Sequence, residues 1–124
     1  MIIHLDTSLL IEAARPPGAP RLRGAADAGH ILTFCTIVLF EWLRGPRTHE
    51  ELQLQQVVFP ESSLVPFDVN AAQRAARIYR TVKNPRSREF DIAIAACAIE
   101  HDAQLWTLNA GDFRDIPGLT LYRA

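Results

Sequence analysis

The segment that most constrains the fold of this chain is the apolar run that begins at Asp91 and ends at Ile99. After the leading acid it reads Ile-Ala-Ile-Ala-Ala-Cys-Ala-Ile, which predicts a helix that is apolar on every side. A helix of that kind cannot lie on the surface of a small protein and is expected at its centre. The other elements are therefore expected to pack around it.

Short apolar and β-branched runs alternate with helical patterns along the chain. We expect strands at residues 2–5, 31–35, 65–67, 104–108 and 119–122, and helices at residues 9–14, 22–28, 37–44, 52–59, 68–82 and 91–99. Strands that alternate with helices favour a parallel sheet covered on both sides. The prediction is an α/β fold with a central parallel sheet of about four to five strands, flanked by helices on both faces.

Three residues mark the expected starts of helices. Thr36 is predicted to cap the helix at 37–44, and Asp68 to open the helix that follows it. Thr48 and Glu51 have the spacing of a capping box, in which each side chain bonds to the backbone N–H of the other residue. These local signals set the helix boundaries.

Length and composition indicate one globular domain over residues 1–124. Apolar residues make up 48% and charged residues 22% of the chain, which is ordinary for a globular protein. No run approaches the roughly 18 apolar residues that span a bilayer, and the short apolar start lacks the features of a signal peptide. We expect a cytoplasmic protein, no membrane contact, and reduced, buried thiols at Cys35 and Cys97.

The formal net charge of −1 excludes a protein that coats nucleic acid through a broad positive field. Arg and Lys recur every three residues from Arg74 onward, and a solvated helix face explains that pattern. If RNA is bound, the candidates for phosphate contacts are Lys83, Arg86 and Arg88, because the loop that carries them leads into Asp91.

Acids and an amide follow two of the predicted strands. Asp6 comes directly after the first strand, and Asn109 and Asp112 follow the strand at 104–108. The carboxyl ends of parallel strands lie at one edge of the sheet, where ligands bind in such folds. Each acid also has a purely structural interpretation, since Asp6 can cap the next helix and Asp112 can serve a turn.

Two further acids interrupt apolar helices. Glu41 lies between Phe40 and Trp42, and a buried carboxylate without a partner costs several kcal/mol. The alternative is an exposed ion pair with Arg44, which contributes only a few tenths of a kcal/mol. Asp91 begins the central helix, where the helix dipole offers another reason for an acid.

Together these carboxylates indicate a site for a hard cation. Asp6, Glu41, Asp91 and Asp112 would repel one another in a cleft, and Mg²⁺ or Mn²⁺ relieves such repulsion through oxygen ligands. A cation held in this way favours hydrolysis of phosphodiester bonds. No Ser-His-Asp or Cys-His pattern and no Walker-type loop competes with this interpretation.

At this point the chain resembles a known family, the PIN domains, and within it the VapC-type toxins of VapBC toxin–antitoxin pairs. The resemblance covers nearly the whole chain. It rests on four blocks in order: Asp6-Thr7-Ser8-x-Leu10-Ile11; Thr36-x-x-x-x-Glu41-x-Leu43-x-Gly45; Asp91-Ile92-x-Ile94-Ala95-Ala96-x-Ala98; and Leu105-x-Thr107-x-Asn109-x-x-Asp112-Phe113 followed by Ile116-Pro117-Gly118-Leu119.

The resemblance implies a PIN-like fold and an endoribonuclease that needs Mg²⁺ or Mn²⁺. It places Asp6, Glu41 and Asp91 at the metal, with Asp112 ranked ahead of Asn109 for the fourth position. Hydroxyl groups of the same pocket are expected to orient water or phosphate. They belong to Thr7, Ser8 and Thr107.

The resemblance also implies partners. It implies an RNA substrate, a homodimer, and a small VapB-like antitoxin whose C-terminal segment wraps the toxin and places an Arg in the acidic pocket. A guanidinium competes with a metal for the same carboxylates, which gives that inhibition a physical basis. The alternative is a non-catalytic binding module on the same fold.

Overall fold

A computed structural model describes residues 1–124 and places a three-stranded parallel sheet at the centre of the protein. The strands are β1 (Ile2–Leu5), β2 (Ile31–Thr33) and β3 (Gln104–Trp106), in the order β2-β1-β3. Register pairs Ile3 of β1 with Leu32 on one side and with Gln104 on the other. The predicted α/β fold with a parallel sheet is confirmed.

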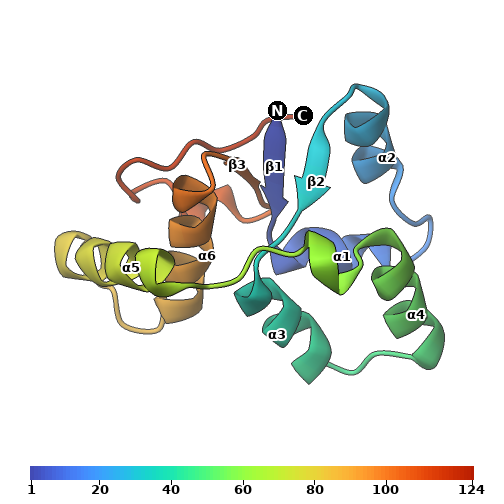
Figure 1. Ribbon diagram of the computed structural model, residues 1–124, viewed down its shortest axis with the longest axis horizontal. Helices are drawn as coiled ribbons and strands as arrows, with labels where there is room; N and C mark the ends of the chain where they lie inside the picture. Colours follow the sequence, from blue (N-terminus) through green and yellow to red (C-terminus); the bar gives the residue numbers. More distant parts are fainter.

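Six α-helices and two short 3₁₀ helices surround this sheet, with α5 and α6 beside β3 and α1 to α4 on the β2 side and below (Figure 1). Both chain ends lie close together at the amino end of β1 (Figure 1). None of the helices is long and apolar enough to cross a membrane. The bounds are α1 (Thr7–Ala13), α2 (Pro20–Asp27), α3 (Thr36–Arg44), α4 (His49–Val58), η1 (Glu61–Ser63), α5 (Val69–Thr81), α6 (Glu89–Glu100) and η2 (Ala110–Asp112).

The central strand β1 is covered on both faces. Side chains alternate between the two faces of a strand, and the three consecutive residues Ile3, His4 and Leu5 are all 1% exposed or less. Helices must therefore pack on both sides of the sheet, as predicted. The carboxyl end of β1 points toward α1 and α3 (Figure 1). Asp6, the residue that follows β1, therefore lies at the start of α1.

The sheet has fewer strands than the predicted four to five. The segments at 65–67 and 119–122 each pair with the sheet at a single position, Val65 with Cys35 and Leu121 with Leu105. Val65 makes both bonds of its bridge, its N–H to the carbonyl of Phe34 and its carbonyl to the N–H of Thr36, and the ladder ends there because Thr36 begins α3 and its hydroxyl accepts the N–H of Phe67. The bridge at Leu105 consists of two bonds, its N–H to the carbonyl of Thr120 and its carbonyl to the N–H of Tyr122.

One predicted helix cap is wrong and two are confirmed. Thr36 is the first residue of α3, after the N-cap Cys35, and its hydroxyl accepts the N–H of Phe67 at 3.0 Å. That contact ties the 65–67 segment to α3, which sequence periodicity does not reveal. The Thr48 and Glu51 capping box is present at 3.1 and 2.8 Å, and the Asp68 carboxylate accepts the N–H of Ala71.

Helix α6 is the central helix that the sequence predicts. Its seven consecutive residues from Ile92 to Ala98 are all buried, and it packs against α5, α3 and β3. Alanine dominates this run, so neighbouring backbones can approach closely. Cys97 within this helix and Cys35 before α3 are both free and buried, in agreement with the expectation for both thiols.

We expect Ala95→Leu to destabilise the protein by about 1–3 kcal/mol, because Ala95 is fully buried and the added carbons have no space. Denaturant unfolding followed by circular dichroism measures this loss. Ala72→Leu, on the exposed side of α5, is the matched control and is expected to leave the midpoint unchanged within error. Equal denaturant midpoints for Ala95→Leu and Ala72→Leu would contradict the tight packing of α6.

Candidate active site

Asp6 is the most firmly positioned of the candidate acids. It lies between β1 and α1, is 7% exposed, and its backbone N–H bonds to the carbonyl of Trp106 at 2.9 Å. Its carboxylate accepts three hydrogen bonds, from the N–H of Thr7 at 2.8 Å and from the hydroxyls of Ser8 and Thr107 at 3.0 and 2.8 Å. Asp6 is therefore also the N-cap of α1, so both interpretations of this residue hold.

The hydroxyls of Ser8 and Thr107 connect two loops at this edge of the sheet. Besides donating to Asp6, the Ser8 hydroxyl accepts the N–H of Leu108 at 3.1 Å, and that of Thr107 accepts the N–H of Asn109 at 3.0 Å. The segment after β3 is thus held against the start of α1. These hydroxyls orient the carboxylate and the backbone, and the predicted contacts of Ser8 and Thr107 to water or phosphate stay a prediction.

Glu41 reaches the same region from α3. Thr7 donates its hydroxyl to one carboxylate oxygen of Glu41 at 2.7 Å, which links α1 to α3. The other oxygen lies 3.6 Å from a guanidinium nitrogen of Arg44, three residues further along the helix. That ion pair is largely exposed on the Arg44 side and so contributes little to stability.

Asp91 feels the charge of the other three acids. The pKa of Asp91 is raised from 3.8 to about 6, first by burial and then by the negative charges of Asp6, Asp112 and Glu41, while Arg88 lowers it. Burial disfavours the charged form of the carboxylate, and the three neighbouring negative charges disfavour it further. Four acids, one directly after β1 and the others on α3, α6 and η2, therefore share one electrostatic environment.

Asp112 is positioned through Arg88. The Arg88 guanidinium forms a two-pronged ion pair with Asp115 and also donates to the backbone carbonyl of Asp112 at 3.0 Å. Arg88 thus joins the start of α6 to η2, and its donors are occupied within the chain. Of the predicted phosphate contacts, Lys83 and Arg86 remain exposed without an ion-pair partner, and Asn109 is exposed at the start of η2.

The donor chemistry of this site fits a hard divalent cation. Carboxylate oxygens are the ligands that Mg²⁺ and Mn²⁺ prefer, and the raised pKa of Asp91 shows negative charge that a cation would neutralise. In this arrangement no three acids, histidines or cysteines are close enough together to form a ready-made ligand set. Binding therefore requires the carboxylates to move toward the ion.

One feature of this region was missed in the sequence. Phe40 directly precedes Glu41, Phe90 directly precedes Asp91, and their rings meet at the surface with the Arg44 guanidinium beside both. A signal was present in the sequence, because a phenylalanine directly precedes each of two candidate acids. The contact itself joins residues of two different helices and needed the fold.

The model of the PIN domain family matches residues 3–119 of the chain. The chain belongs to the PIN-domain family. PIN domains are generally nucleases, so the family agrees with a site of clustered acids. No curated protein matches this PIN domain in sequence.

Solved structures share the fold of this PIN domain at low sequence identity. The DNA-bound VapBC structure from Salmonella typhimurium matches with a TM-score of 0.77 at 20% identity, covering 98% of this chain and 97% of that one. VapBC2 from Rickettsia felis, bound to a DNA fragment from its promoter, matches at 0.75 and 19%, covering 98% of both chains. FitAcB from Neisseria gonorrhoeae matches at 0.70 and 22%, covering 99% of this chain and 97% of that one.

We expect Asp91→Asn to raise the thermal midpoint of the metal-free protein at neutral pH. The folded-state pKa of Asp91, about 6, lies above its ordinary value of 3.8, so its protonation stabilises the folded form. That stability is complete at low pH and is lost as the pH rises through about 6. Relief of the burial penalty and of the repulsion together amounts to about 1 kcal/mol after solvent screening is discounted, or roughly 2–4 °C.

The measurement is differential scanning fluorimetry across pH in EDTA. The gain is expected to be full near pH 8 and to disappear below about pH 4. Glu61→Gln, an exposed acid in η1, is the control and is expected to show no such pH-dependent gain. A destabilised Asp91→Asn protein at neutral pH would contradict the mutual repulsion of these acids.

Proposed function

We propose that this PIN domain is a metal-dependent endoribonuclease that hydrolyses phosphodiester bonds of RNA. Asp6, Glu41, Asp91 and Asp112 would hold Mg²⁺ or Mn²⁺. The observation that carries the proposal is that Asp91 lies within the electrostatic reach of the other three acids: burial raises the pKa of Asp91 to about 6 together with the negative charges of Asp6, Asp112 and Glu41. Membership of a family whose members are generally nucleases supports it.

The side chains around the site prepare it for this chemistry. When bound, the cation would lower the pKa of a water molecule and neutralise charge that develops on the phosphate. Three donors hold Asp6, so its carboxylate has a single orientation. The Thr7 hydroxyl holds one oxygen of Glu41 and leaves the other directed at the half-exposed guanidinium of Arg44, which a cation would displace.

We expect the purified protein to cleave RNA in Mg²⁺ or Mn²⁺ but not in EDTA. Asp6→Asn and Asp91→Asn are each expected to lower the rate at least about 100-fold, since loss of a ligand removes several kcal/mol of transition-state stabilisation. Gel electrophoresis of a labelled RNA over time measures the rate. The control is Glu61→Gln, which removes an acid far along the chain from the four.

Two other outcomes would reject parts of this proposal. Equal cleavage by all variants would identify a contaminating nuclease. An absence of cleavage in either metal would favour the non-catalytic binding module. Thermal unfolding measures Mg²⁺ binding separately from cleavage. Added Mg²⁺ should raise the thermal midpoint of the wild type more than that of Asp6→Asn.

We further propose that the protein is the toxin of a toxin–antitoxin pair. Its fold is similar to chains of VapBC and FitAcB structures. An apolar groove of about 530 Å³ lies between α1, α2 and α4 and supports the binding of an apolar antitoxin segment. Residues that line it include Leu10, Leu22, Trp42, Leu54 and Val58.

Where the neighbouring open reading frame encodes a short antitoxin-like chain, Leu54→Glu is expected to abolish co-purification with that chain when the two are expressed together. Leu54 is 59% exposed and lines the groove, so a charge there opposes an apolar partner without disturbing the core. Val57→Glu is the control on the same helix, because Val57 is 78% exposed and lies outside the groove. Retained binding by Leu54→Glu would reject this groove as the antitoxin site.

The implied homodimer stays a prediction that light scattering tests.

A further inference from the structure

Two aromatic side chains lie exposed beside the acids. Phe40 on α3 is 51% exposed and Phe90 on α6 is 38% exposed, although both are large and apolar. Their rings are 5.8 Å apart between centroids and meet edge to face at 71°. Because Glu41 and Asp91 directly follow them in sequence, this aromatic pair borders the candidate active site from two helices.

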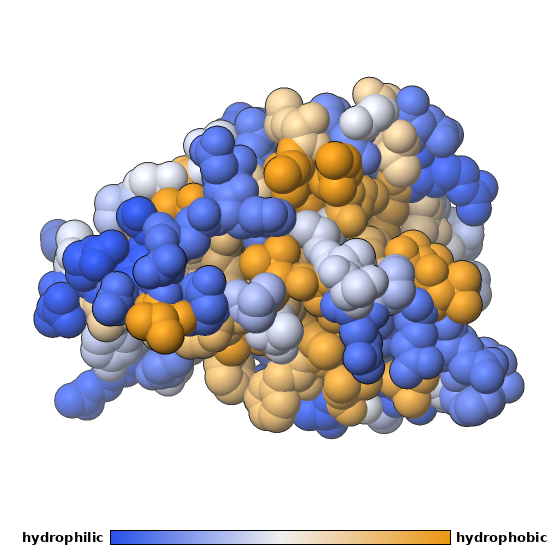
Figure 2. Space-filling view, in the orientation of Figure 1, coloured by the Kyte–Doolittle hydropathy of each residue, from blue (hydrophilic) through white to orange (hydrophobic).

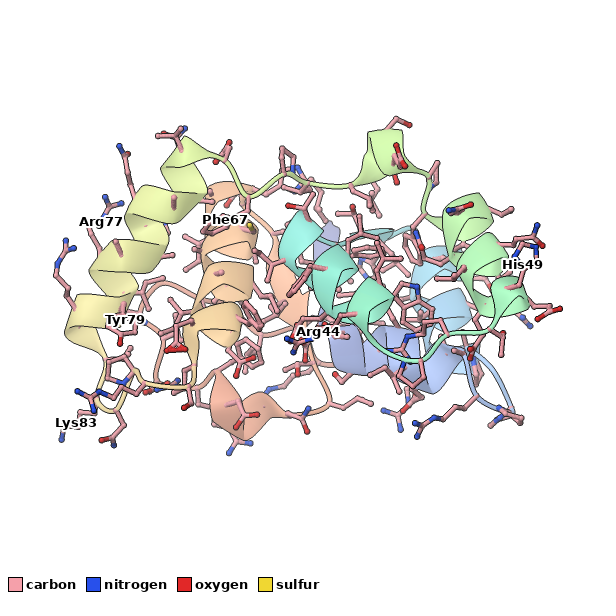
Figure 3. All side chains as sticks on the ribbon, turned by 90° about the horizontal axis from the view of Figure 1, so that it is seen from below. Arg44, His49, Phe67, Arg77, Tyr79 and Lys83 are labelled. Atoms are coloured by element: carbon pink, nitrogen blue, oxygen red, sulfur yellow. The ribbon has the colours of Figure 1, made fainter.

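Arg44 connects the aromatic pair to the acids. Its guanidinium carbon lies 5.4 Å from the ring centroid of Phe40 and 5.0 Å from that of Phe90, within the range of cation–π attraction. The same guanidinium is 3.6 Å from the carboxylate of Glu41. Figure 3 shows the Arg44 side chain directed from α3 toward α6. We call Phe40, Arg44 and Phe90 the aromatic cluster.

The aromatic cluster has the chemistry that binds a nucleobase. Bases stack on aromatic rings and on guanidinium planes, and such stacking is tolerant of sequence. The side chain of Arg44 is 51% exposed, so the outer side of the cluster is open to solvent. Its positive charge is also suited to a phosphate that approaches the acids, which would otherwise repel it.

The distribution of charge favours a polyanion over a protein at this surface. Residues 69–88 contain six of the 13 Lys and Arg residues and none of the 14 Asp and Glu residues, and this basic segment ends two positions before Phe90. Figure 2 shows hydrophilic residues gathered at the α5 end of the molecule. Four of these cations form no ion pair within the chain: Arg77, Arg80, Lys83 and Arg86.

We propose that the aromatic cluster stacks an unpaired base of the RNA next to the phosphate that is hydrolysed at the acids. The substrate is accordingly single-stranded at that point, because a paired base has no free face to stack on. Phe40 and Phe90 supply the stacking surface, and Arg44 supplies charge to the neighbouring phosphate. This inference rests on the proposed nuclease function and assigns its substrate class.

The test measures binding separately from cleavage, in an Asp6→Asn background. Fluorescence anisotropy compares a short labelled single-stranded RNA with an abasic oligomer of the same length and charge. Stacking of one base contributes about 1–3 kcal/mol, so the RNA should bind roughly tenfold more tightly than the abasic oligomer, or better. Phe40→Leu and Phe90→Leu should each reduce that preference severalfold while leaving affinity for the abasic oligomer unchanged.

Tyr79→Leu is the matched control, since Tyr79 on α5 is 37% exposed, nearly as much as Phe90, and lies outside the cluster. It should retain the preference for RNA. Thermal unfolding of each variant verifies that an exposed Phe is replaced without loss of the fold. Equal affinity for both oligomers in the parent protein, or an unchanged preference after both Phe substitutions, would overturn the inference.

Failure of the inference and failure of the nuclease function give different results. Metal-dependent cleavage without any base preference would reject the aromatic cluster and leave the nuclease standing. Base-dependent binding without cleavage would support the cluster and reject the hydrolysis. If either Phe substitution converts a dimer to a monomer in light scattering and the base preference stays, the cluster is a contact between copies of the chain, and the inference is wrong.

Discussion

The central strand β1 is the constraint on which the rest of the structure depends. It is hydrogen-bonded on both edges, by β2 and β3, and covered on both faces, so its position is determined from four sides. Asp6 follows it directly and is tied to the end of β3 through Trp106 and Thr107. A rigid strand therefore delivers the first acid to the point where α1, α3 and the loop after β3 meet.

The acids around Asp6 are held together at a cost to stability. Hydroxyl and amide donors orient Asp6 and Glu41, yet burial and the negative charges of the other three acids still raise the pKa of Asp91. The positive charge of Arg88 offsets part of the negative charge of Asp91 and Asp112, but its guanidinium binds mainly to Asp115. Uncompensated charge of this kind is typical of a site that binds a ligand of opposite sign.

Helix α3 joins the candidate active site to the apolar groove. Glu41 faces Thr7 at the acids, whereas the next residue, Trp42, is buried and lines the groove between α1, α2 and α4. Successive residues of a helix point about 100° apart, so one short element serves both surfaces. Under our proposal, α3 thus carries residues of both the antitoxin groove and the acid site, and Phe40 and Arg44 of the aromatic cluster belong to the same helix.

Local pattern in the sequence determined the central apolar helix, the strand before Asp6, the Thr48 capping box and the set of acids to consider. Each of these depends on neighbouring residues, whose period and polarity can be read directly. The tertiary structure decided which distant residues contact one another. The segment at 65–67 pairs with the sheet at a single position, the Thr36 hydroxyl accepts the N–H of Phe67, Arg88 pairs with Asp115, and Phe40 meets Phe90 fifty residues away. These contacts join distant segments, and their geometry exists only once the chain has folded around α6.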